Sequence, residues 1–367
     1  MLNKVKISSR QFTILTTLFT IGSAILVVPS GIAALAKQDA WIAALAGLAA
    51  GVIIISMHIL LAKQHPGKTL VEMLDTLLGK WLGRTVALVF IATLFLCGPS
   101  AVLNILSNFL TTQMMPETPI QSLNILFAVI VLMGVYLGIE TFSRSAELIF
   151  PWIALLYIAF IVLVSFDVKP TNLLPVLENG MRPIWPAALS FVCTAFLPNI
   201  ILLMIIPSVD NRRNEAGRAL LIGGIIGSVV TIVIITITIM VFGPEFTARS
   251  MYPTYALARK ISIGNFLQRL EAIMATIWFI SLYFRMTIYM YAISIALAQI
   301  FNLKEYRPLV LPLGMLLVVM SVIVYPNITY QNSWDTRTWI PYTLVIGFIL
   351  PLLMLCLSGF RNLNKQG

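Results

Sequence analysis

The sequence predicts an all-α integral membrane protein with ten transmembrane helices, and three observations lead to this fold class. Hydrophobic residues make up 59% of the 367 residues and charged residues only 10%, whereas soluble domains contain about 25% charged residues. The apolar residues gather in stretches of the roughly 20 residues that a helix needs to cross a bilayer core. Backbone N–H and C=O groups must be paired inside lipid, so these stretches must be helical.

The expected helices are separated by short polar loops, and no long polar segment divides the chain. Residues 1–367 are therefore expected to form one polytopic membrane domain. In chain order, the helices are expected at residues 11–36, 40–62, 84–110, 120–139, 146–166, 184–206, 218–242, 270–298, 308–325 and 338–359.

The basic residues predict the orientation of the chain. Lys4, Lys6 and Arg10 precede the first apolar run, which continues to Ala36. This run is too long for the apolar part of a signal peptide, so we expect a retained first helix. With the N-terminus in the cytoplasm, most basic loop residues lie on the cytoplasmic side, and an even number of spans returns the C-terminus there. The net charge of +10 is thereby explained without a nucleic-acid partner.

The first expected helix contains residues that interrupt a helix. Gly22, Ser23 and Ala24 lie at its mid-depth, and Pro29 follows one to two turns later. Glycine and proline weaken the helical hydrogen-bond ladder and free backbone groups. In hydrocarbon such groups persist only where they line a cavity or face protein.

The sixth expected helix has a similar interruption, around Pro198 in residues 194–199. The first and sixth helices occupy matching positions in two halves of five helices, residues 11–166 and 184–359. Paired interruptions of this kind indicate an inverted repeat with a ligand site near the middle of the membrane. The alternative is that both are simple kinks, which are common in membrane helices.

Arg285 lies near the centre of the expected helix 270–298. A charge at that depth costs at least ~2.5 kcal/mol, so Arg285 should face the bundle interior and pair with carbonyls, a carboxylate or aromatic rings. Trp278, Ser281 and Tyr289 share its helical face, which makes a cation–π partner available. The opposite face, which includes Thr287, is also polar, so either face could line a cavity. A packing role and a ligand or ion role for Arg285 both stay open.

No pattern in the sequence indicates an enzyme, so no catalytic residues, metal ligands or cofactors are expected. Paired carboxylates, a nucleophile with its base and a phosphate-binding loop are all missing from usable positions. Glu140, Glu147 and Glu271 lie near the ends of spans, so an obvious proton carrier at the membrane centre is missing too. Cysteines occur only within apolar spans, at Cys97, Cys193 and Cys356, and are expected to be buried small hydrophobes.

Short motifs spread along the whole chain resemble one known family, the permease-like B subunits of bacterial endospore germinant receptors. This family belongs to the amino acid–polyamine–organocation transporter superfamily. Each motif is weak alone, but their order and spacing agree with ten spans. The motifs are residues 78–83 (LGKWLG), 118–121 (TPIQ), 172–177 (NLLPVL), 252–254 (YPT), 269–271 (RLE) and 325–326 (YP).

The resemblance implies a leucine-transporter-like fold and a subunit that senses nutrients in the inner membrane of the spore. Such a subunit binds a small germinant, here expected to be an amino acid. It acts with the A and C receptor subunits to trigger germination. The superfamily fold places the ligand among helices one, three, six and eight. On this chain, that arrangement nominates Gly22, Ser23, Ala24, Cys97, Thr194, Phe196, Leu197 and Thr287.

Two other functions are compatible with the sequence. An amino-acid permease coupled to protons or sodium would share the same fold, and fold alone does not determine function. A scaffold that holds receptor partners without binding a ligand is the third possibility. The missing central carboxylate and the family motifs favour the receptor subunit over the permease.

Overall fold

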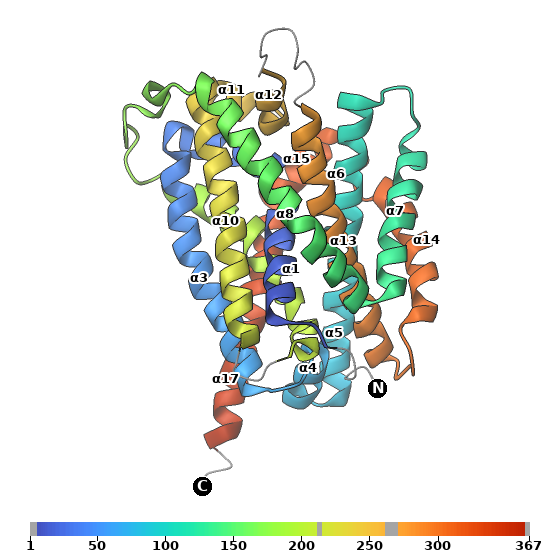
Figure 1. Ribbon diagram of the computed structural model, residues 1–367. Coiled ribbons are helices and arrows are strands. Elements are labelled where there is room, and N and C mark those ends of the chain that lie inside the picture. Colours follow the sequence, from blue (N-terminus) through green and yellow to red (C-terminus); the bar gives the residue numbers. More distant parts are fainter. Residues whose placement is uncertain (1–5, 211–214, 261–270, 364–367) are drawn as a thin grey trace.

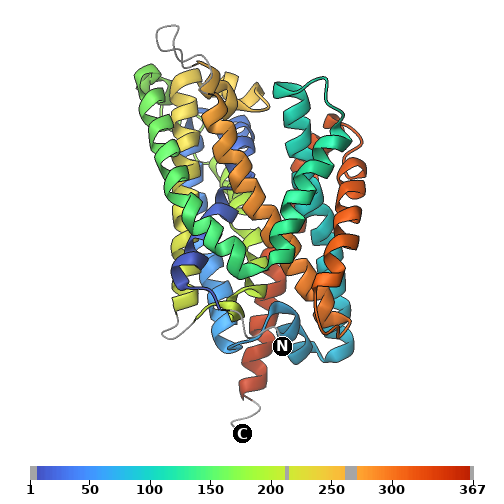
Figure 2. The same cartoon turned by 45° about the vertical axis from the view of Figure 1, so that its right-hand side comes forward.

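The computed structural model describes residues 6–210, 215–260 and 271–363. Within these ranges every element is an α, 3₁₀ or π helix, and one isolated β-bridge joins Ile7 to Val209. The all-α prediction is therefore confirmed. Arg269 and the first residue of the helix expected at 270 lie outside the described residues. The long helices run side by side as a bundle, and α13 crosses its middle obliquely in both views (Figures 1 and 2).

The first span consists of two half-helices, as predicted. α1 (Ser9–Ile21) begins with a capping box in which Ser8 and Gln11 bond each other's backbone amides, and it ends at Gly22. α2 (Ala24–Ala36) then starts after Ser23. Pro29 lies inside α2 without ending it, so the only interruption in this described span is at Gly22 and Ser23.

The sixth span is interrupted as well. α9 (Ile184–Ala195) ends before Phe196, and the chain continues as a 3₁₀ helix, η7 (Leu197–Met204), with Pro198 in its first turn. Proline has no N–H to donate to the preceding α-helical turn, which explains the change of helix type at this point. Both predicted interruptions are thus confirmed.

Eight helical runs in the described chain are long and apolar enough to cross a membrane. One of them, Ala24–Gln64, joins the second half of the first span, α2, to the whole second span, α3 (Ala40–Gln64). The two are separated by the turn η2 (Lys37–Asp39), in which Lys37 adopts a φ of 50°. A further apolar helix, α14 (Arg307–Ile323), is only 17 residues long. When Ala24–Gln64 is assigned to the first and second spans and α14 is counted as a span, the described chain contains the ten predicted spans.

The remaining elements complete the bundle and its ends. They are α4 (Leu70–Leu78), α5 (Lys80–Phe95), η3 (Leu96–Ser100), α6 (Ala101–Phe109), η4 (Leu110–Met114), α7 (Ile120–Leu137), α8 (Ile139–Val164), η5 (Ser165–Asp167), η6 (Pro170–Leu173), η8 (Ile206–Ser208), α10 (Glu215–Phe242), α11 (Pro244–Arg249), α12 (Pro253–Lys260), α13 (Glu271–Ile300), α15 (Ile328–Arg337), α16 (Trp339–Leu344), η9 (Val345–Ile349) and α17 (Leu350–Leu363). The start of α1 and the end of α17 lie at one end of the bundle, and α11 and α12 lie at the other (Figure 1).

The outer surface of the bundle is apolar, as a lipid-facing surface must be. On α8, for example, Leu148, Trp152, Leu155 and Ile158 form an exposed stripe at helical spacing. Cys97 and Cys193 are buried, but Cys356 is exposed on the outer face of α17. The expectation that all three cysteines are buried was wrong for Cys356, because an apolar span can present a small side chain to lipid as readily as to protein.

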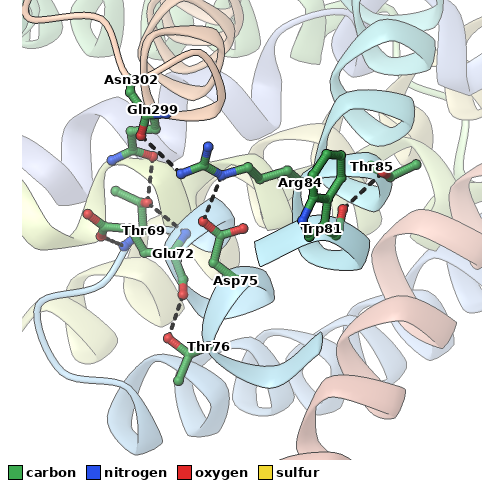
Figure 3. A network of polar contacts seen from close by, with 9 residues as sticks. All are labelled: Thr69, Glu72, Asp75, Thr76, Trp81, Arg84, Thr85, Gln299 and Asn302. Carbon is green, nitrogen blue, oxygen red and sulfur yellow. Dashed lines mark hydrogen bonds and ion pairs between the residues drawn. The ribbon is translucent and has the colours of Figure 1, made fainter. Parts of the chain in front are cut away.

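Polar contacts attach the short helix α4 to one end of α13 (Figure 3). The Thr69 hydroxyl donates to Gln299 Oε1 over 2.8 Å and accepts the amide of Glu72. Arg84 on α5 approaches Asp75 Oδ2 at 3.4 Å and donates from Nη2 to Asn302 Oδ1 at 3.0 Å. These bonds hold the end of the same helix that carries Arg285 at its middle.

Candidate ligand-binding site

A cavity of about 450 Å³ lies beside the interruption in the first span. Its walls come from α2, η3, α6, α9, α13, α15 and α16, and most of them are apolar, for example Val27, Val102 and Ile340. Cavities of roughly 300–1,000 Å³ with a few placed polar groups are typical of small-molecule sites. Charged residues line it only at Arg285 and Asp335, among the residues that the structure describes.

Arg285 is 1% exposed and is held by the end of α1. Its Nη1 donates a 2.7 Å hydrogen bond to the carbonyl oxygen of Phe19, and its guanidinium lies 4.8 Å from the centroid of the Phe19 ring. A second ring, that of Tyr289, lies at 5.6 Å, and Nη2 contacts the Tyr289 hydroxyl at 3.4 Å. The last carbonyls of a helix have no helical partner and carry partial negative charge, so the interruption itself supplies a partner for the buried cation.

Gly22 is the residue that lets Arg285 come so close to α1. A Cβ at this position would lie 2.3 Å from Arg285 Cδ and 2.9 Å from the Phe19 carbonyl oxygen. Neither distance is compatible with a real side chain, so any larger residue must displace the arginine or the chain. The small residue that the sequence places at the break is therefore needed for packing as well as for backbone freedom.

The N-terminus of α2 faces the same region. Ser23 lines the cavity as the residue before α2, and the first amides of a helix lack helical acceptors and carry partial positive charge. Arg285 adds a full positive charge beside them, and its Nε has no hydrogen-bond partner among the described residues. This end of the cavity is therefore suited to an anionic group such as a carboxylate.

Asp335, on α15, lines the cavity as well. Burial raises the pKa of this carboxyl to about 7. Sequence reasoning missed Asp335, because it lies in a connection between two expected spans. The available signal was a lone carboxylate in an aromatic segment, where Tyr330, Trp334 and Trp339 surround it in sequence.

The nominated ligand residues separate into two groups in the structure. Those that line the cavity are Ser23, Cys97 and Thr194, together with Arg285. Tyr289 on α13 lines it with Arg285, so this face of α13, and not the opposite one, borders the cavity.

The other nominated residues lie outside the cavity wall. Gly22 packs under Arg285, as described, and Ala24 is fully buried in α2. The Phe196 ring packs toward Gly51 of α3, and Leu197 packs toward Gly347 of η9. Thr287 donates to the Tyr283 carbonyl at 2.7 Å and points toward Gly134 of α7.

The fold is shared with solved transporters at low sequence identity. The first is a nucleobase–cation symport-1 family transporter, solved in a closed conformation with bromovinylhydantoin bound. It matches with a TM-score of 0.70 and 12% identity, over 94% of this chain and 78% of that one. The second, MhsT in complex with L-phenylalanine, matches with a TM-score of 0.59 and 14% identity, over 96% and 98%. The predicted leucine-transporter-like fold is confirmed.

Comparison with characterised sequences identifies the family. The chain is 29% identical to spore germination protein KB of Bacillus subtilis (strain 168), over 100% of this chain and 98% of that one. It is 28% identical to spore germination protein YndE of the same organism, over 98% of both. A family model described as spore germination protein matches residues 6–336. The resemblance found in the sequence motifs is thus confirmed, and this chain belongs to the spore germination protein family.

Proposed function

We propose that the protein is the nutrient-sensing B subunit of a spore germinant receptor and that it binds an amino-acid germinant in the cavity beside Gly22 and Ser23. The observation that carries this proposal is that Arg285 and Ser23, the residue before α2, line the same apolar cavity. An arginine and free helix amides are the two protein groups that bind carboxylates most readily. The apolar walls would hold an uncharged side chain.

The nominated residues take different parts in this proposal. Ser23 and the first amides of α2, including that of Ala24, would bind the carboxylate beside Arg285. Cys97 and Thr194 would contact the rest of the ligand, because both line the cavity. Gly22, Phe196, Leu197 and Thr287 would act from behind the wall, by allowing the two interruptions and the position of α13.

The cellular setting extends the same proposal. The protein would lie in the inner membrane of the spore with both termini facing the spore core, and would act with A and C subunits. Support comes from the basic residues of the expected inner loops and from the common end at which α1 begins and α17 ends (Figure 1). The cavity wall includes exposed residues near the other end of the first span, such as Leu35, so a germinant would enter from outside.

Binding of amino acids to the purified full-length chain in lipid nanodiscs tests the proposal. A panel of the common L-amino acids would be measured by calorimetry, first on the wild type and then on Arg285→Met. We expect the variant to lose about 10- to 100-fold in affinity, as for a lost charge-assisted hydrogen bond.

Arg307→Met is the matched control for this substitution. Arg307 also lies over an aromatic ring, that of Tyr136 at 5.7 Å, and also donates to a backbone carbonyl, but it does not line the cavity. It should leave amino-acid affinity unchanged. A wild-type chain that binds no member of the panel contradicts the proposal.

An amino-acid permease is the second candidate, because the fold is that of transporters. Concentrative uptake of a radiolabelled amino acid into proteoliposomes that contain only this chain would favour the permease. Binding without uptake would favour the receptor subunit. A scaffold role would require that a bulky residue at position 23, which lines the cavity, leaves the nutrient response of spores unchanged.

A further inference from the structure

Asp335 differs from the other described acidic residues in its surroundings. It is only partly exposed and lines the central cavity. The ion pairs between described side chains are Arg10–Glu147 and Arg84–Asp75, so Asp335 has no basic partner within ion-pair distance. Burial raises the pKa of this carboxyl, as expected for a group that has lost water and gained no opposite charge.

A carboxylate in this situation is costly for the apo protein. Removing an ionised group from water is unfavourable unless a partner replaces the lost hydrogen bonds. Tyr325 lies near enough for Asp335 to act on its hydroxyl electrostatically, but a neutral phenol does not balance a negative charge. In the apo protein the carboxyl avoids this cost by taking up a proton, whereas a positive group bound in the cavity would stabilise the ionised form.

The two charged residues of the cavity wall come from separate elements. Arg285 belongs to α13 in the membrane centre, and Asp335 belongs to α15, the short helix that precedes α16. The rest of the wall is uncharged among the described residues. The cavity of about 450 Å³ is therefore lined by one cation and one anion, and a ligand that contacts both carries one negative and one positive group.

From this arrangement we propose that Asp335 is the specificity residue that binds the ammonium group of a zwitterionic ligand whose carboxylate faces Arg285. The ligand is an α-amino acid with an uncharged, apolar side chain, because the remaining walls of the cavity include Val27, Val102 and Ile340. This inference rests on the proposed function, since it names the second recognition group of the same cavity. It also assigns α15 a direct role in ligand selection.

The experiment compares three probes that differ only in their charged groups. L-valine has both groups, 3-methylbutanoate lacks the ammonium group, and isobutylamine lacks the carboxylate. Each is titrated into the full chain in nanodiscs at pH 8, because a higher pH favours the ionised form of Asp335. If another apolar amino acid of the panel binds more tightly than L-valine, that amino acid is used instead, with its own analogues that lack the ammonium group or the carboxylate. The wild type should bind the amino acid about 10- to 100-fold more tightly than the analogue without nitrogen, as for one charge-assisted contact.

Asp335→Asn should reduce amino-acid affinity by the same factor and leave the affinity of 3-methylbutanoate within about twofold. The preference for the amino acid over the analogue without nitrogen should therefore disappear. Arg337→Gln is the matched control, since Arg337 is an exposed charge two residues along the same helix and does not line the cavity. Arg337→Gln should keep the full preference for the amino acid over 3-methylbutanoate. Thermal unfolding of each variant in nanodiscs establishes that it is folded.

Two results would overturn the inference in distinguishable ways. If Asp335→Asn keeps both the affinity and the discrimination while Arg285→Met weakens binding, the ammonium contact is wrong and the proposed function stands. If the wild-type chain binds no amino acid of the panel, the proposed site and this inference fall together.

Discussion

Arg285 donates a 2.7 Å hydrogen bond to the carbonyl oxygen of Phe19 and lies 4.8 Å from the centroid of the same residue's ring. One side chain on α13 thereby satisfies a carbonyl at the interrupted end of α1 and stacks on the residue that carries it. The break at Gly22 and the buried arginine depend on each other. The Phe19 carbonyl gives the buried guanidinium an acceptor, and the guanidinium pairs a carbonyl that the break would leave unpaired in the membrane. Ligand binding at this point would therefore act on the junction between α1, α2 and α13.

The first prediction concerns Gly22. Gly22→Ala should destabilise the protein by about 1–3 kcal/mol, the usual cost of an overpacked position, because its Cβ would meet Arg285 Cδ at 2.3 Å. Thermal unfolding in nanodiscs measures this change. Gly359→Ala is the control, since a Cβ there meets no atom within 4 Å. Equal stability of the two variants would contradict the packing of Arg285 on Gly22.

The second prediction concerns the contact between α3 and the interruption in the sixth span. A Cβ on Gly51 would lie 2.2–2.4 Å from three atoms of the Phe196 ring, so Gly51→Ala should also destabilise by about 1–3 kcal/mol. Phe196→Ala removes the ring, and the double variant should be more stable than the sum of the single effects implies. A coupling energy of about 1 kcal/mol or more in the double-mutant cycle is expected for residues in contact. Additive effects would show that the two residues do not meet.

The third prediction concerns pH. Because burial raises the pKa of Asp335 to about 7, the folded apo protein binds this proton more tightly than the unfolded chain does. Its contribution to the free energy of unfolding is therefore greatest at low pH and falls as the pH rises from the unfolded value near 4 through 7. An ammonium ligand prefers the ionised carboxylate, so amino-acid affinity should rise between pH 6 and 8 and then level off.

The other titratable groups on the cavity wall are Arg285, Cys97, Tyr289 and Tyr325. None of these residue types ordinarily titrates between pH 6 and 8, so Asp335→Asn should remove the pH dependence of binding. Affinity measured by calorimetry across this range checks the prediction. A rise in affinity that persists in Asp335→Asn would show that a group other than Asp335 causes it.

The fourth prediction concerns the contacts at the end of α13 (Figure 3). Thr69→Ala removes the N-cap of α4 and the bond to Gln299, so it should cost about 0.5–2 kcal/mol, as measured for lost helix caps. Thr85→Ala is the matched control, because the Thr85 hydroxyl is exposed and bonds only the Trp81 carbonyl one turn earlier. Thermal unfolding should separate the two variants, and a Thr69→Ala protein as stable as Thr85→Ala would contradict the role of the cap.

Much of the fold could be predicted from local sequence. Helical spans follow from their apolar length, and the interruptions at Gly22 and around Pro198 follow from residues that weaken a helix wherever they occur. The two short helices α11 and α12, by contrast, fall in a segment that looks like a loop, residues 243–269. Their mixed composition has no single periodicity that separates a surface helix from a turn.

For the site, the sequence itself determined that a buried charge at Arg285 and freed backbone at Gly22 exist in the same membrane domain. Both are expensive in lipid at any position, so their cost can be read from the residues alone. Only the tertiary structure decided that Phe19 is the acceptor for Arg285, that Thr287 faces away toward α7, and that Asp335 reaches the cavity from α15. Those relationships depend on which elements pack together across long separations in the chain. In lipid this packing comes from van der Waals fit and interhelical hydrogen bonds, whose partners cannot be read from local sequence.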